Sequence, residues 1–533
     1  MSERGDRPPI KHTSSQRSTV IHKVSTARQT SYRTQRTGVS GVLLTVFAIA
    51  LLTYAPLAPN DHAGNLPGMA VLPRLLLVRS RPMTTQTARG AMNGWIDEVR
   101  PIDPQTLADS PGYTPIQLEA RYRSALSPDN QTLAFLTSPD DRSVPPKSES
   151  QRVYTLRLLD LAGWREHQTP VAVAGTIGWF GFGADNRHIY WLVSTDSDET
   201  PQIGRDYTLY RYALGTLHAE MVAQLPRGIV GEAWSDLRPL RSGRQLVFYD
   251  LASAANGRPQ LHFLDLASGQ SIATLPLAGV RTGATLGASG EERFLPGLSW
   301  DMAHDRLYVA HADTDTITTV DLARRTIIRQ AAIGDDSAVP TYDLEQYTVD
   351  RALTAGRVQY RFATLDTTGN SLIVSGRETI TEPLPGGRWQ VRDRIDTMRV
   401  IATATFRVNG QLPERTALVT ATERGILIRT VRYVNSYPSL EPGDFQLRFL
   451  DPDDLHELWR GNTAPGDIWT IGNSPDGRFV YLISPNNGGF APRNGASGLD
   501  DNAVGVFDLA NRQLTGERVM PKVGGLILLW PNR

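Results

Sequence analysis

One pattern recurs along most of this chain: a tight-turn sequence followed at once by a run of β-branched and aromatic residues. The turns contain pairs such as Asp-Gly, Asp-Asn and Gly-Asn, which supply the positive backbone φ angles that short hairpins need. The runs that follow have the composition of β-strands. The copies begin at Ser127, Gly183, Arg241, Asp301, Asp366, Thr420 and Ser474, mostly roughly 60 residues apart.

A second strand pattern, ending in Asp-Leu or Asp-Pro and a polar turn, follows most of these hairpins. Its copies begin at Tyr154, Leu261, Ile317, Phe445 and Val504. A further short strand after each copy completes a unit of four antiparallel strands, which is typical of a β-propeller blade. The chain is therefore expected to be all-β, a propeller of seven or eight blades. The count of first strands favours eight, and seven holds if residues 385–440 are an insertion.

The two ends of the repeat region look like complementary parts of one more unit. Residues 522–533 resemble the first strand of a blade with nothing after it, and residues 69–110 resemble later strands with no first strand. Pairing between them would close the ring and remove exposed sheet edges. We therefore expect the propeller to span 69–533, closed by the C-terminal strand.

The Ser-Pro-Asp turns and the hairpin over 307–334 resemble the YVTN, TolB and WD40-like β-propeller repeats. The copy at Leu307 departs from the YVTN letters, because it reads Tyr308-Val309-Ala310-His311. The resemblance implies a propeller and, in general terms, a binding platform, an assembly scaffold or more rarely an enzyme. It brings no catalytic residues, and the fold hosts many roles.

The N-terminal region indicates a membrane tether. Residues 1–38 carry eight basic and two acidic residues among Ser, Thr and Gln, so we expect a disordered arm. Residues 39–55 form an apolar run near the short end of what spans a bilayer, and the preceding charges favour a cytoplasmic N-terminus. The expectation is a transmembrane signal anchor over 39–55, a linker over 56–68 and an extracytoplasmic propeller on a single-pass cell-membrane protein.

Two other interpretations of this region stay open: a cleaved signal peptide and a buried core helix. Pro56 and Pro59 follow the run and disfavour cleavage. The basic arm is interpreted as a topology signal that also contacts anionic lipid headgroups, and no nucleic-acid partner is expected.

Several kinds of chemistry are excluded or disfavoured by the residues. The chain has no cysteine, which excludes disulfides, thiolate metal sites and cysteine nucleophiles. It lacks a G-x-S-x-G elbow, an H-E-x-x-H pair and a P-loop, so Ser127 and Ser474 are interpreted as turn residues. His304 and His311 share one hairpin and were the candidates for convergence on a metal. We expect no catalytic residue, no metal site and no cofactor.

Long polar segments follow the second strand of five units: 139–150, 195–206, 381–394, 435–444 and 486–502. In a four-stranded meander these connections emerge on one face, the elaborated face, and the tight turns emerge on the other. Loops on a rigid scaffold commonly carry function, although long loops are also simply tolerated. The five segments hold seven basic and thirteen acidic residues, so this face should be mildly acidic. The candidate ligand-binding residues are Asp196, Asp198, Glu199, Trp389, Tyr437, Phe490, Arg493, Asp500 and Asp501.

Short acidic clusters such as Asp313-Thr314-Asp315 and Asp451-Pro452-Asp453-Asp454 have oxygen ligands of the kind that Ca²⁺ prefers, but they are interpreted as solvated turn carboxylates. The leading hypothesis is a membrane-anchored, non-catalytic binding or scaffold module for a protein, peptide or glycan. The alternative is a propeller enzyme, a hydrolase, lyase or quinoprotein-like oxidoreductase, with its site in the central channel. A third hypothesis is a sensor whose arm signals inside the cell.

Overall fold

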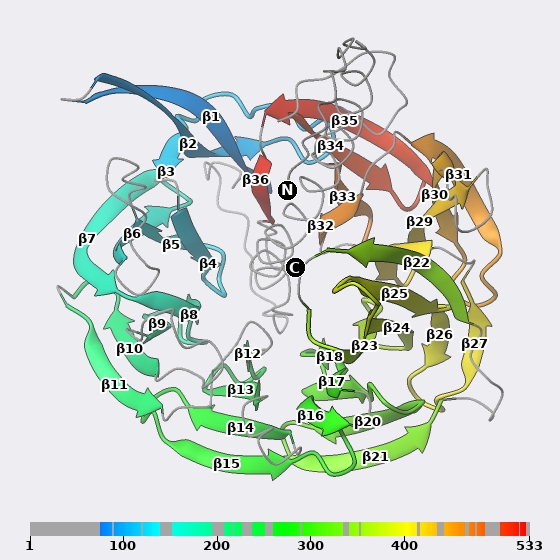
Figure 1. Ribbon diagram of the computed structural model, residues 1–533. Helices are drawn as coiled ribbons and strands as arrows, with labels where there is room; N and C mark the ends of the chain where they lie inside the picture. The colour runs from blue at the N-terminus through cyan, green and yellow to red at the C-terminus, as the bar shows by residue number, and fades with distance from the viewer. Residues whose placement is uncertain are drawn as a thin grey trace, which may run out of the picture. The chain divides into compact units, whose positions relative to one another are not determined.

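The computed structural model describes residues 75–87, 90–118, 121–138, 152–194, 207–216, 218–225, 237–250, 259–287, 290–333, 341–350, 353–412, 416–433, 442–463, 468–474, 477–484, 501–521 and 523–528. Every regular element in these ranges is a β-strand, and none is a helix. The strands form successive sheets of a β-propeller, as the sequence predicted (Figure 1).

Seven of the sheets have four strands and one has eight, within the described ranges. Six of the four-stranded sheets are regular blades made of four consecutive antiparallel strands (Figure 1). The first three are β4 (Arg121–Leu126), β5 (Thr132–Ser138), β6 (Val153–Asp160), β7 (Arg165–Ala174); β8 (Thr176–Phe182), β9 (His188–Ser194), β10 (Tyr207–Ala213), β11 (Glu220–Leu225); and β12 (Leu237–Pro239), β13 (Gln245–Asp250), β14 (Gln260–Asp265), β15 (Ser271–Pro276).

The other three regular blades are β18 (Gly297–Asp301), β19 (Arg306–Ala310), β20 (Thr316–Asp321), β21 (Thr326–Ala332); β28 (Thr416–Thr422), β29 (Gly425–Tyr433), β30 (Pro442–Leu450), β31 (Glu457–Thr463); and β32 (Trp469–Asn473), β33 (Phe479–Ser484), β34 (Asp501–Asp508), β35 (Gln513–Pro521). The expectation of seven or eight blades is therefore corrected to six. The count was too high because the two remaining sheets also contain blade-like strands but are built differently.

Tight turns join the first and second strands of the blades, at the positions where the sequence repeat placed them. Their backbone enters the left-handed region at Asn130 (φ 57°), Asn186 (φ 54°) and Gly477 (φ 64°), which explains the Asn and Gly of the repeat. The Ser474 hydroxyl accepts hydrogen bonds from the backbone N–H groups of residues 478 and 479, at 3.1 and 2.7 Å. The Ser127 hydroxyl makes the equivalent contacts. Both serines are turn residues, as predicted.

A closing sheet joins segments from the two ends of the described chain. It contains β1 (Leu75–Thr87), β2 (Gly90–Ile102), β3 (Ile116–Leu118) and β36 (Val523–Leu528), in the order β3-β2-β1-β36. β36 pairs antiparallel with β1, from Leu75 opposite Leu528 onward. The side chain of Arg518 on β35 donates to the backbone carbonyl of Leu107 at 2.6 Å, so the closing sheet also contacts the neighbouring blade.

The core consists of apolar clusters between one sheet and the next. Second strands are buried on both faces, so β9 and β33 are almost continuously apolar instead of alternating. Trp191 on β9 is 1% exposed and packs with Ala134 and Leu136 of the preceding blade. Sheet-on-sheet contacts of this kind supply the main driving force for folding in a chain that has no disulfide.

The eight-stranded sheet is the main departure from the repeat. Its strands are β16 (Gly283–Gly287), β17 (Gly290–Leu295), β22 (Thr341–Val349), β23 (Gly356–Leu365), β24 (Ser371–Pro383), β25 (Trp389–Asp396), β26 (Arg399–Ala402) and β27 (Val408–Gln411). They follow the order β16-β17-β23-β24-β25-β22, and β26 and β27 join through β24. The segments on either side of the blade β18–β21 therefore belong to the next sheet along the chain.

Candidate functional site

The eight-stranded sheet has a blade-like half and a second half that extends beyond it. The residues of β23 and β24 nearest their tight turn pair with each other, and β26 pairs with β24 over Ser371–Val374. The remaining residues of these two long strands also pair with each other, and in addition they pair with β17 and β25. We call β16, β17, β22, β25 and the outer halves of β23 and β24, residues 356–360 and 377–383, the satellite sheet.

The satellite sheet lies on the elaborated face. It starts at the ends of β23 and β24 that are remote from their tight turn, where Gly369 has φ 78°. These ends are where the second-to-third connection of a blade emerges. The segment 381–394, predicted to be a polar loop, is a β-hairpin made of the end of β24 and most of β25, and this prediction was wrong. Gly386 and Gly387, with φ 82° and 77°, form its turn.

One face of the satellite sheet is charged. The strand register places Gln359, Glu378 and Arg394 side by side on β23, β24 and β25. Glu378 forms ion pairs with Arg357 and, at 3.7 Å, with Arg394. Arg392 pairs with Glu382 at 3.1 Å. Charged residues of both signs thus alternate across the strands, which makes this face polar but close to neutral.

A carboxylate of the neighbouring blade holds the eight-stranded sheet in place. Asp315, in the β19–β20 connection, accepts two hydrogen bonds from Arg399 at 2.7 and 2.6 Å and one from Arg361 at 3.2 Å. Arg361 also pairs with Asp396 and donates from Nε to the carbonyl of His311 at 3.1 Å. Arg399 is almost completely buried, so its charge depends on Asp315 for compensation.

His311, whose backbone carbonyl accepts the hydrogen bond from Arg361, is buried beside these contacts. Its side chain is 2% exposed, and its Nε2 lies 2.8 Å from the hydroxyl of Thr318. Burial lowers the pKa of His311 below its usual value of 6.5, and the nearby Asp313 carboxylate offsets part of that effect. His304 lies in the tight turn at the other end of β19, where it contacts Asp301 at 2.8 Å. The two histidines therefore do not converge.

A polar cavity of about 340 Å³ opens beside the charged face of the satellite sheet. Strands β17 and β23 supply Glu292, Arg293, Phe294, Arg357 and Gln359 to its lining. The opposite wall comes from outside the satellite sheet: Arg281 from the turn before β16, and Asp313 from the β19–β20 connection. The cavity thus joins residues that are far apart in sequence and that no motif brings together.

The carboxylate of Asp313 has incomplete hydrogen bonding. The Oδ1 atom of Asp313 is buried and has no hydrogen-bond partner among the described residues. The nearest cation is Arg281, whose Nη1 lies 3.8 Å from the other carboxylate oxygen, too far for a hydrogen bond. Arg281 is instead positioned over the ring of Phe294, 3.9 Å from its centroid. The cavity therefore presents a donor and an acceptor that do not satisfy each other.

Of the predicted ligand-binding residues, the structure fully describes only Trp389. It is the first residue of β25, it is half-buried, and it belongs to the satellite sheet. Asp501 begins β34, but the position of its side chain is outside the described part of the chain. Asp196, Asp198, Glu199, Tyr437, Phe490, Arg493 and Asp500 all lie outside the described residues.

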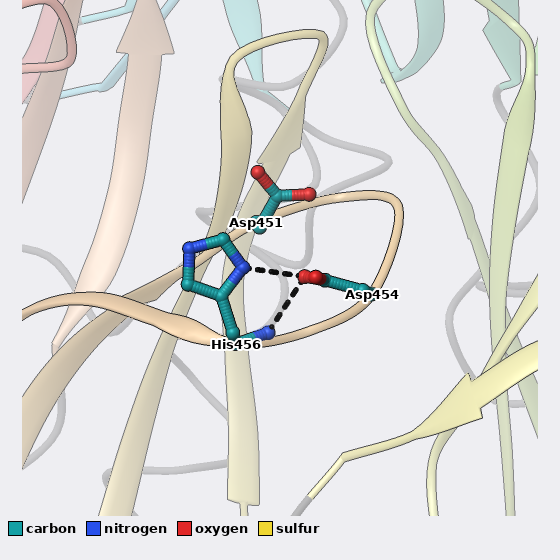
Figure 2. A group of neighbouring side chains, drawn as sticks. All are labelled: Asp451, Asp454 and His456. Carbon is teal, nitrogen blue, oxygen red and sulfur yellow. Dashed lines mark hydrogen bonds and ion pairs between the residues drawn. The ribbon is translucent and has the colours of Figure 1, made fainter.

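Asp451, Asp454 and His456 form a group that has the composition of a metal site (Figure 2). They lie in the turn between β30 and β31, and Asp454 contacts His456 at 2.5 Å. The position of Asp451 has a structural explanation: its carboxylate accepts from the backbone N–H of residue 453, as Asp508 does from residue 510 in the corresponding turn of the next blade. We interpret this group as part of the repeated Asp-containing turn.

No family model matches this chain, and no curated protein matches it in sequence. The resemblance to YVTN, TolB and WD40-like repeats therefore holds only at the level of the propeller fold. The fold is similar to that in a crystal structure of the eukaryotic initiation factor, at 11% identity and a TM-score of 0.40 over 85% of this chain and 97% of that one. Apo AztD from Citrobacter koseri matches at 10% identity and a TM-score of 0.41, over 85% and 97%.

The Dos1 propeller matches at 10% identity and a TM-score of 0.38, over 76% of this chain and 86% of that one. Similarity at this level carries no information about function, and the fold assignment rests on the sheet topology itself. Among the described residues, which begin at Leu75, no helix is both long and apolar enough to cross a bilayer. The apolar run 39–55 lies outside those residues.

Proposed function

We propose that this protein is a membrane-anchored, extracytoplasmic propeller that acts as a non-catalytic binding or scaffold module for a protein, peptide or glycan. The satellite sheet and its cavity are the proposed binding face. The observation that carries the proposal is the departure from the repeat: one sheet has eight strands where the regular blades have four, and the additional strands join the ends of β23 and β24 that are remote from their tight turn. Rigid β-structure presents ligand contacts with little loss of conformational entropy on binding.

The charges of the satellite sheet support a recognition role. Ion pairs on an exposed strand face contribute little to stability, because solvent screens them. Arg392 and Glu382 are 44% and 49% exposed, and they leave the face polar instead of covering it with apolar core. Alternating charges of this kind give register and specificity to a partner surface more than they give stability to the sheet.

The binding role is tested with the full-length protein cross-linked in its native membranes. Partners captured by the wild type are compared with those captured by a double variant, Arg392→Glu with Arg394→Glu, on the charged face. The matched control is Arg187→Glu with Arg424→Glu, which reverses exposed charges on the tight-turn face. We expect the first variant to lose its partners and the control to retain them. Equal capture by both variants would overturn the assignment of the binding face.

The anchor is tested separately, with protease added to intact cells that express an N-terminally tagged chain. We expect the propeller to be degraded while the tag stays protected on a short membrane-bound fragment. Release of the whole propeller into the medium without protease would support the cleaved-signal alternative and would contradict the anchor.

A further inference from the structure

We infer that the cavity beside the satellite sheet binds a neutral polyhydroxylated ligand, a sugar unit of a glycan. This inference rests on the proposed function, because it assigns a ligand class to the same face. The cavity volume of about 340 Å³ is at the small end of ligand sites and corresponds to about one or two sugar rings. The argument has three steps: the charge of the lining, the unpaired hydrogen-bonding groups, and the lack of apolar surface.

The charge of the lining favours a neutral ligand. Three guanidinium groups lie at the cavity: Arg281, Arg293 and Arg357. The lining also contains two carboxylates, Glu292 and Asp313. Arg293 and Arg357 are paired in addition with Glu291 and Glu378, which lie outside the lining, so the positive charge of the lining is compensated. An anionic ligand would find no excess of positive charge here, and a cationic ligand would have to approach three arginines. Neutral ligands avoid both penalties.

The unpaired groups require a ligand that both donates and accepts hydrogen bonds. Asp313 presents a carboxylate acceptor to the cavity, and Arg281, which is 47% exposed and too far from that carboxylate to donate to it, presents N–H donors. A hydroxyl group supplies one donor and two lone pairs, so a single hydroxyl between the two side chains satisfies both. Buried acceptors in folded proteins are rarely left without a partner. Glu292 has no ion pair or hydrogen bond to another described residue, and it offers a second acceptor for a neighbouring hydroxyl.

The lining also holds its polar groups in fixed positions. The ring of Phe294 lies under the guanidinium of Arg281, which holds that donor in place. The side-chain carbonyl of Gln359, in the amide orientation that suits its neighbours, accepts from Arg357 Nη2 and Nε at 2.8 and 3.1 Å. The Gln359 amide nitrogen then remains as a donor. Fixed donors and acceptors in planar side chains match the closely spaced hydroxyls of a sugar ring.

The nearly complete lack of apolar surface favours a sugar over a peptide. Among the described residues, Phe294 is the only apolar side chain in the cavity lining, and the guanidinium of Arg281 lies over its ring. Peptides are commonly recognised by apolar or aromatic-lined grooves that accept their side chains, and the lining of this cavity is not of that kind.

The test uses the full-length protein in a detergent without a sugar headgroup, and it measures ligand binding by saturation-transfer NMR and calorimetry. The probes are glucose, galactose, mannose and N-acetylglucosamine, together with glucuronate and the capped peptide N-acetyl-alanine amide. We expect at least one neutral sugar to bind and Asp313→Asn to weaken it at least tenfold. Glu292→Gln, which breaks no ion pair, should weaken sugar binding several-fold. This second variant keeps the inference testable if Asp313→Asn fails to fold.

The matched control is Glu423→Gln, an exposed carboxylate in the tight turn between β28 and β29 and outside the cavity lining, and it should leave sugar binding unchanged. The inference is overturned if no neutral sugar binds, if the control weakens binding as much as Asp313→Asn does, or if glucuronate or the capped peptide binds more tightly than every neutral sugar. Absence of sugar binding together with loss of partners in the Arg392/Arg394 variant would overturn this inference alone. Sugar binding with unchanged partner capture would support the inference and overturn the proposed partner-binding role.

Discussion

The blade β8–β11 and the satellite sheet are both antiparallel hairpin structures, but different forces hold them. The blade buries Trp191, Leu192 and Val193 in succession on its second strand, between two other sheets. The satellite sheet instead alternates arginine and glutamate on one face, and Asp315 binds Arg361 and Arg399 in the blade-like half beside it. The comparison shows how one fold separates stability from recognition: apolar packing builds the ring, and charged strands are added where little of the ring depends on them.

The largest expected effect comes from the blade core. Trp191→Ala removes a side chain that is 1% exposed, and it should lower the free energy of unfolding by about 3–5 kcal/mol. The measurement is urea unfolding of the full-length protein in detergent, followed by circular dichroism. The matched change is Phe362→Ala, on the blade-like half of β23 and 51% exposed, which should cost about 0.5 kcal/mol or less. Similar losses in the two variants would contradict the conclusion that buried packing between blades stabilises the ring.

The second effect concerns the ion pairs that Asp315 forms with Arg361 and Arg399. Asp315→Asn leaves the buried guanidinium of Arg399 without its charge partner and also weakens the contact with Arg361. We expect a loss of about 2 kcal/mol, below the figure for a fully buried pair because Asp315 is 31% exposed. Hydrogen exchange should speed up mainly in β23 and β26, which carry Arg361 and Arg399. Uniform acceleration of exchange in all blades would show instead that the ion pairs of Asp315 stabilise the whole propeller.

A third effect is a dependence on pH that originates at His311. Because burial lowers the pKa of His311, the folded protein keeps the ring neutral where the unfolded chain takes up a proton. The contribution to stability is complete above about pH 6.5 and is lost as the pH falls from there toward the folded pKa, by at most about 1.4 kcal/mol per pH unit. The carboxylate of Asp313 and the guanidinium of Arg361 face the same region.

This contribution is measured as the difference between unfolding curves of the wild type and His311→Gln at pH 5 and pH 7. The difference between the two proteins should shrink at the lower pH. A difference that stays constant would show that protonation of His311 is not linked to folding.

The smallest effect is expected on the exposed charged face. Arg392→Gln breaks a pair in which both side chains are almost half exposed, so it should change the free energy of unfolding by about 0.5 kcal/mol or less. The same unfolding assay at low and high salt checks this value. A loss of several kcal/mol would mean that the charged face stabilises the ring and is not reserved for recognition.

The repeat in the sequence was sufficient to predict the all-β propeller and the positions of its tight turns. Turn chemistry is local: Asn130 and Gly477 adopt positive φ angles because of their own side chains or the lack of one. The number of regular blades was not predictable in this way. Strands β23 and β24 carry the turn motif of a blade, but their outer halves pair with β17 and β25, and that choice depends on segments distant in the chain.

The candidate site was largely unpredictable from the sequence, because its charged strands have the composition of polar loops. The hairpin at 381–394 is rich in arginine and acidic residues. A strand that is not buried on both faces can have this composition, but the same composition is also typical of a loop. Asp315 was interpreted as a solvated turn carboxylate, whereas it holds Arg361 and Arg399. The cavity residues Arg281 and Asp313 carry no motif that links them, because their proximity arises only from the pairing of β17 with β23.

The pairing of β1 with β36 also has a consequence for biosynthesis. During translation the edge of β1 emerges early and must wait, unpaired, until all the intervening blades have been made. A nascent chain therefore cannot seal its ring before β36 has left the ribosome and, for a translocated protein, crossed the membrane. Any truncation upstream of Val523 would leave an open strand edge that recruits other chains, so a premature stop codon late in the gene should cause aggregation out of proportion to the few residues lost.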